Sequence, residues 1–80
     1  MMVMSKVTKL PPKDILDKAK RFFDGKYGLK MLESDPSCCA HFMSDIGFVT
    51  VRIVSSGEYN EAILETREWD YQIQEFLKMI

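Results

Sequence analysis

The chain has 80 residues, of which 46% are apolar and 29% charged, and its formal net charge is −1. A chain of this length forms one small domain. Its composition excludes a disordered chain, and its short apolar runs exclude a membrane-spanning helix. The apolar start, Met1 to Met4, stops at Ser5-Lys6 and lacks the long apolar region of a secretory signal. We therefore expect a cytoplasmic protein.

Charge is distributed unevenly along the chain. Residues 1–30 carry eight Lys and Arg and three Asp, whereas residues 31–80 carry three Lys and Arg and nine Asp and Glu. A basic segment of this kind can bind nucleic acid. Aspartates interrupt the basic segment, however, and phosphate binding needs a concentrated positive patch. We expect the two halves to lie side by side and neutralise each other, which leaves weak nucleic-acid binding through the first helix as a less favoured alternative.

The first element expected along the chain is a helix. Residues 1–10 show no clear period, and we interpret them as a short leader that is free to be disordered. A single domain is expected to span residues 11–80. Residues 12–24 have apolar side chains at helical spacing, and Pro12 suits the first helical turn. Gly25 is expected to end this helix.

Four strands are predicted next, because short runs rich in β-branched and aromatic residues alternate with turn-forming residues. They cover residues 28–34, 38–43, 48–54 and 60–66. A second helix follows, for which Thr66 is the expected N-cap.

The element order predicts an α+β fold, α-β-β-β-β-α. Short connections favour antiparallel neighbours, so the four strands should form a meander. Both helices must bury an apolar stripe, and packing them on one sheet face achieves this. The predicted core contains Phe22, Phe23, Val51, Ile53, Leu64, Trp69, Ile73 and Leu77.

Alternation along the strands predicts a mixed set of side chains on the opposite sheet face. The expected outward residues are Phe48, Arg52, Val54, Ile63 and Glu65. On the strand at 38–43, either Cys38, Ala40 and Phe42 or Cys39, His41 and Met43 point outward. A solvated sheet face is usually more polar than this one. We therefore interpret the face as the interface of a homodimer, with an unidentified protein partner left open.

The two cysteines are the main chemical feature of the sequence. Cys38 and Cys39 are adjacent, and because a ring closed between neighbours is strained, an ordinary structural disulfide is not expected. Cys39 and His41 share one face of a strand and are candidate metal ligands. A structural zinc site has four ligands, and no second cysteine pair or second histidine exists. We predict no metal and no cofactor, with small-ligand or metal binding at Cys39 and His41 as the alternative.

No catalytic constellation is recognisable. Cys39 and His41 stand two residues apart on a strand, which is long for direct activation of the thiol. No third group is placed to orient the histidine. The sequence therefore predicts a non-enzymatic interaction module without catalytic residues.

Overall fold

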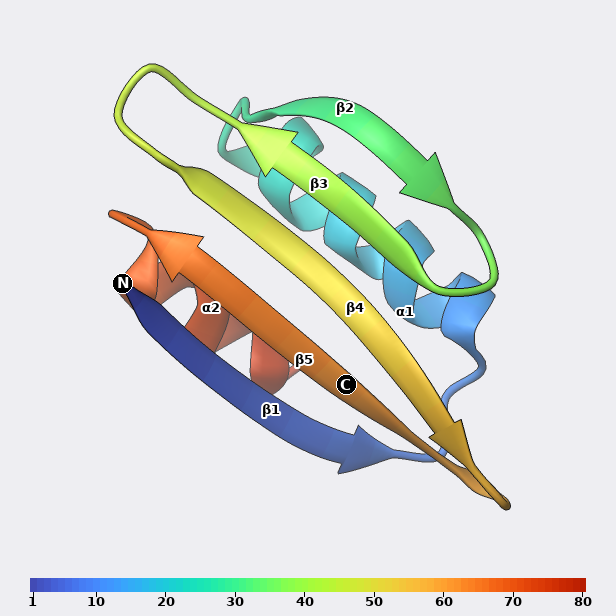
Figure 1. Cartoon of the computed structure of the whole chain (residues 1–80). Helices are drawn as coiled ribbons and strands as arrows, with labels where there is room; N and C mark the ends of the chain where they lie inside the picture. Colours follow the sequence, from blue (N-terminus) through green and yellow to red (C-terminus); the bar gives the residue numbers. More distant parts are fainter.

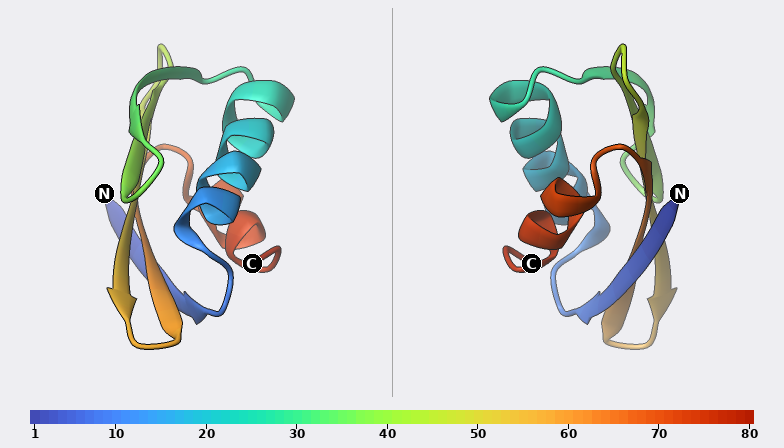
Figure 2. Two further views of the ribbon diagram at one scale, coloured as in Figure 1. Left: turned by 90° about the vertical axis from the view of Figure 1, so that its right-hand side faces the viewer. Right: turned by 90° about the vertical axis from the view of Figure 1, so that its left-hand side faces the viewer.

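A computed structural model of the protein describes residues 1–80 and has five antiparallel strands with the helices on one face (Figure 1). Figure 2 shows both α-helices on the same side of the sheet. The elements are β1 (Met2–Thr8), α1 (Pro12–Ala19), the π-helix η1 (Lys20–Lys26), β2 (Lys30–Asp35), β3 (Cys39–Met43), β4 (Phe48–Ser56), β5 (Tyr59–Arg67) and α2 (Asp70–Leu77). The α+β class and the antiparallel sheet are confirmed.

The predicted number of strands is wrong, because the expected leader forms β1. This strand pairs with β5 from Met2↔Thr66 to Thr8↔Asn60. The strand order is β1-β5-β4-β3-β2, so the predicted meander exists as β2 to β5 and β1 is added beside β5. Pairing with β1 satisfies backbone groups along an edge of β5 that would otherwise remain unpaired.

The first helix is longer than predicted and does not end at Gly25. After α1 the chain continues as the π-helix η1, in which Gly25 is an internal residue. The helix ends at Lys26 with Tyr27 as its C-cap, and Gly28 follows with a φ of +75°, a left-handed conformation that favours glycine. The N–H of Leu29 then donates to the Phe23 carbonyl at 2.9 Å. The wider helix keeps Phe22 and Phe23 both buried.

The core lies between the helices and the inner sheet face. Phe23, Phe42 and Phe76 are fully enclosed. The ring of Phe23 lies 5.5 Å from that of Phe42 and 5.4 Å from that of Phe76. Burying each large apolar side chain contributes about 1.5–3 kcal/mol. The complete set of buried apolar residues is Ile15, Leu16, Ala19, Phe22, Phe23, Leu29, Ala40, Phe42, Val49, Val51, Ile53, Ala62, Leu64, Ile73, Phe76 and Leu77.

The predicted core is confirmed except at Trp69, which is only partly buried. The indole Nε1–H of Trp69 donates to Ser44 Oγ at 3.0 Å. The turn between β3 and β4 supplies Ser44, so the tryptophan joins this turn to the start of α2. Its ring also packs on Tyr27, with the centroids 6.1 Å apart.

Thr66 does not cap α2 as predicted. It is the last inward residue of β5, and its hydroxyl donates to the Phe48 carbonyl at 2.7 Å. The same Oγ1 accepts the N–H of Trp69 at 3.3 Å. Between them Glu68 adopts a φ of +78°, so the chain reverses sharply before α2 begins at Asp70.

None of the helices combines the length and the apolar character that crossing a membrane would require.

Candidate functional site

The sheet face turned away from the helices is the candidate site, and we call it the outer face. Its side chains alternate along each strand with the buried residues of the inner face. The outer face includes Val3, Ser5, Val7, Cys39, His41, Met43, Phe48, Thr50, Arg52, Val54, Glu61, Ile63 and Glu65.

Three of the expected interface residues lie close together. Arg52 of β4 stands directly opposite Ile63 of β5, and Glu65 follows Ile63 on the same side of β5. Together with Val3 and Thr50 they line a small hollow of about 100 Å³. The centre of the outer face therefore combines a cation, a carboxylate and apolar side chains.

The other two expected residues lie towards opposite ends of β4. Val54 stands opposite Glu61, and its side chain is 48% exposed. Phe48 stands opposite Arg67 at the start of β4. Its ring stacks on His41, with centroids 5.8 Å apart and an interplanar angle of 29°. The predicted set is therefore spread along the face rather than gathered in one patch.

Sequence reasoning missed the contribution of β1 to this face. Val3 stands opposite Glu65, and Val7 opposite Glu61, with 59% and 58% of their surfaces exposed. The two valines flank Ile63, whose partner on β1 is Ser5. The signal in the sequence was Val3-x-Ser5-x-Val7, a β-branched alternation that an interpretation as leader concealed.

The charged groups of the outer face are not paired with one another. The one ion pair in the structure joins Lys78 to Glu75 on α2, at 3.4 Å. Arg52 and Glu65 therefore share the central hollow without an intrachain salt bridge. Both charges remain available to groups from outside the chain.

A larger pocket, of about 540 Å³, opens between β2 and β3. It lies where the strand register shifts between Met31 and Glu33, which lets the edge strand bulge. Its lining consists of Leu32, Glu33, Ser34, Asp35, Cys39, Ala40, His41 and Thr50. Two of these lining residues are hydrogen-bonded to each other, His41 through Nδ1 and Thr50 through Oγ1, at 2.8 Å.

The strand β3 places Cys39, His41 and Met43 on the outer face, because Ala40 and Phe42 are buried on the inner one. This decides between the two orientations that the sequence left open. The two candidate metal ligands, Cys39 and His41, do share one face. No group of three or more His, Cys, Asp or Glu side chains is placed to hold a metal ion.

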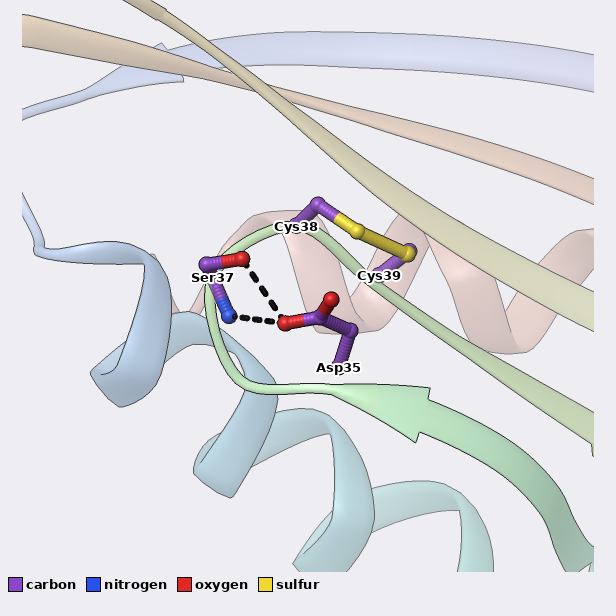
Figure 3. Close-up of a disulfide and its surroundings, with 4 residues drawn as sticks. All are labelled: Asp35, Ser37, Cys38 and Cys39. Atoms are coloured by element: carbon purple, nitrogen blue, oxygen red, sulfur yellow. Dashed lines mark hydrogen bonds between the residues drawn. A yellow bond between two sulfur atoms is a disulfide. The ribbon is translucent and has the colours of Figure 1, made fainter.

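Cys38 and Cys39 are joined to each other by a disulfide (Figure 3). The sequence predicts no ordinary structural disulfide, and this bond is not one. The bond joins neighbours in the sequence, so it fastens no two separate segments together. While the bond is intact, the Cys39 sulfur has no thiolate to offer a metal.

The turn that carries the disulfide is held by Asp35. Its Oδ1 accepts the backbone N–H of Ser37 at 2.9 Å and the Ser37 hydroxyl at 2.7 Å (Figure 3). The backbone hydrogen bond, followed by the hydroxyl bond, holds the pKa of the Asp35 carboxyl below its ordinary value.

Comparison with known proteins adds no relative: no protein-family model matches the chain, and no curated protein or solved structure matches it.

Proposed function

We propose that this chain is a non-enzymatic interaction module that forms a homodimer through the outer face of its sheet. The observation that supports the proposal is the apolar content of a face that no element of the chain covers. Val3, Val7 and Val54 are each about half exposed or more there, beside partly buried Ile63. A second copy that covers these side chains would remove apolar surface from water on both chains.

The unpaired charges support a second copy as the occupant. Arg52 and Glu65 lie in the same hollow with no intrachain ion pair. A twofold axis through the face would bring Arg52 of one chain to Glu65 of the other, and the reciprocal pair would form as well. One self-complementary patch would then satisfy two charges on each chain.

The test is the mass of the protein in solution. Static light scattering over a dilution series from high to low micromolar should give a dimer mass that falls towards that of a monomer. Ile63→Lys places two like charges near the proposed axis and should give a monomer at every concentration. Tyr71→Lys is the matched control, because Tyr71 is 64% exposed on α2, on the helical side of the molecule.

Circular dichroism must show that both variants keep the fold. A monomer mass for the unmodified chain at high micromolar concentration contradicts the proposal. Equal effects of Ile63→Lys and Tyr71→Lys on the mass contradict it as well, because they would show that the interface does not involve the outer face.

The pocket between β2 and β3 supports a second candidate, the binding of a small organic cation. Its volume is about 540 Å³, and its lining combines the carboxylates of Glu33 and Asp35 with the apolar side chain of Leu32. Amide chemical shifts recorded during titration with small aromatic amines test this candidate. It predicts shifts confined to β2, β3 and the neighbourhood of Thr50 in β4, and these shifts should be lost in Glu33→Gln.

A further inference from the structure

We propose that Cys38 and Cys39 form a reversible thiol–disulfide exchange site for low-molecular-weight thiols, with Arg52 as the residue that promotes exchange at Cys39. The proposal does not depend on dimer formation. It rests on what the disulfide connects, on how it is exposed and on the residue that faces it across the sheet.

The disulfide does not act as a structural cross-link. A disulfide stabilises a fold mainly by closing a loop of the unfolded chain, and adjacent residues enclose no such loop. The turn is held by other bonds: the N–H of Cys38 donates to the Asp35 carbonyl at 3.0 Å, and the Cys38 carbonyl accepts the N–H of Ile53 at 2.7 Å. Asp35 and Ser37 add two side-chain bonds. The fold is therefore expected to survive opening of the disulfide.

The disulfide is accessible to small molecules. Cys38 and Cys39 are both partly exposed, and Cys39 lines the pocket between β2 and β3. Buried structural cysteines are inert, whereas exposed sulfurs are open to exchange. A small thiol can reach Cys39 from this pocket, and it can reach Cys38 from solvent, because Cys38 is itself partly exposed.

Arg52 stands directly opposite Cys39 in the pairing of β3 with β4. Both residues point to the outer face, where opposite side chains have Cβ atoms about 4.5–5.5 Å apart. Arg52 has no intrachain ion pair, so in the monomer its guanidinium is free to stabilise a Cys39 thiolate. Asp35 stands opposite Cys39 on the other side, and its carboxylate already accepts two hydrogen bonds from Ser37. His41, the next outward residue of β3, is hydrogen-bonded to Thr50.

The reaction has two balanced steps. The thiolate of an external thiol attacks Cys38 Sγ, the bond between the two protein sulfurs breaks, and its electron pair leaves on Cys39 Sγ beside Arg52. A second external thiolate then attacks the external sulfur of this mixed disulfide. Cys38 leaves as a thiolate and takes a proton from water, and one external disulfide is released. Two electrons pass from two small thiols to the protein, and the reverse reaction restores the disulfide.

The first experiment equilibrates the full chain with glutathione, a tripeptide monothiol, at several ratios of its reduced and oxidised forms. Free thiols are then trapped with iodoacetamide, and the intact mass is measured. The proposal predicts only unlabelled and doubly labelled chains, in proportions that follow the glutathione ratio from either direction. Circular dichroism should be the same at both extremes.

The second experiment tests the role of Arg52 in the Cys38→Ser background, where Cys39 is the only thiol. Arg52→Gln should slow alkylation of Cys39 by iodoacetamide at pH 7 by about threefold to tenfold, because each unit of thiol pKa changes the thiolate fraction about tenfold. Arg67→Gln is the matched control, since Arg67 lies on the same strand pair but opposite Phe48. The alkylation rate should not change with protein concentration. This distinguishes an effect of Arg52 on Cys39 within one chain from an effect of dimer formation.

Several results would overturn the proposal. The disulfide could stay closed at every glutathione ratio, or oxidation could join separate chains instead of joining Cys38 to Cys39. Unfolding of the chain on reduction would also contradict the proposal. Equal alkylation rates in Arg52→Gln and Arg67→Gln would remove Arg52 from the site.

Discussion

Lys6, on the edge strand β1, donates a hydrogen bond from its Nζ to the backbone carbonyl of Leu77, at 2.9 Å. The same ammonium also donates to the Ile80 carbonyl at 2.6 Å. The last carbonyls of a helix have no partner within it, and the negative end of the helix dipole favours a cation. Lys6 thus provides a hydrogen-bond donor for carbonyls at the end of α2, and it connects β1 to the helices on the inner face of the sheet.

Lys6→Met should lower the free energy of unfolding by about 1–2 kcal/mol, because it removes charge-assisted hydrogen bonds while keeping a long apolar stem. Urea denaturation measures the change. Lys20→Met, at an exposed position of η1, is the matched control and should stay within about 0.5 kcal/mol of the unmodified chain. Equal effects of the two substitutions would show that the contact with α2 contributes nothing.

Gly47→Ala should destabilise the fold by about 1–3 kcal/mol or more, the usual cost of forcing atoms into a packed site. A Cβ at Gly47 would overlap the backbone carbonyl oxygen of Arg67, so the turn before β4 and the end of β5 would have to separate. Gly25→Ala meets no atom within 4 Å. Because residue 25 lies inside the helix η1, Gly25→Ala should raise the free energy of unfolding by about 0.4–1 kcal/mol. Thermal melts should show a lower melting temperature for Gly47→Ala and a higher one for Gly25→Ala than for the unmodified chain.

Phe22→Ala should cost about 3–5 kcal/mol of unfolding free energy, a large fraction of what a small domain has. The ring is only 7% exposed, and it contacts Phe23 and Phe76 at centroid distances of 5.1 and 5.8 Å. Tyr71→Ala removes an exposed aromatic ring from α2 and should cost less than about 1 kcal/mol. A similarly small loss for Phe22→Ala would show that Phe22 is not part of the core.

The pH dependence of the β2–β3 turn should follow the protonation of Asp35. Its folded pKa lies below the ordinary value, chiefly because of the Ser37 backbone N–H. The carboxylate therefore stabilises the turn above the ordinary pKa, and this contribution is lost as the pH falls through the lower folded value. Ser37→Ala removes only the hydroxyl, so it should raise the pKa part of the way. A carbon-detected NMR titration of the Asp35 carboxyl measures this, with Ser34→Ala as the control that leaves both bonds in place.

Regular patterns made much of the fold predictable. Val49, Val51 and Ile53 alternate with polar residues, and this alternation correctly assigned the two faces of β4. Helical spacing correctly placed Phe22 and Phe23 in the core.

Features that depend on distant partners could not be predicted. β1 was missed because Lys6 occupies an inward position, which only its bonds to the end of α2 explain. Trp69 resembled a core residue until its hydrogen bond to Ser44 was known.

In the candidate site, too, features set by local alternation could be predicted and features set by strand pairing could not. The outward positions of Arg52, Ile63 and Glu65 follow from alternation along β4 and β5. The sequence could not show that Arg52 faces Cys39, because that relation depends on the register between β3 and β4. The alternation of Val3 and Val7 is visible in the sequence, but it does not show that they join this face, because β1 pairs with a strand far along the chain.

The pairing of Met2 with Thr66 has a consequence for the order of events during synthesis. The ribosome makes β1 before α1, η1 and strands β2 to β4, and the partner strand β5 only after all of these. Strands β2 to β5 can form step by step as adjacent hairpins, whereas β1 must wait for a loop that spans most of the chain to close. The nascent chain thus carries β1, with Val3 and Val7, unpaired until β5 has been made, an interval in which a chaperone or another nascent chain has access to it.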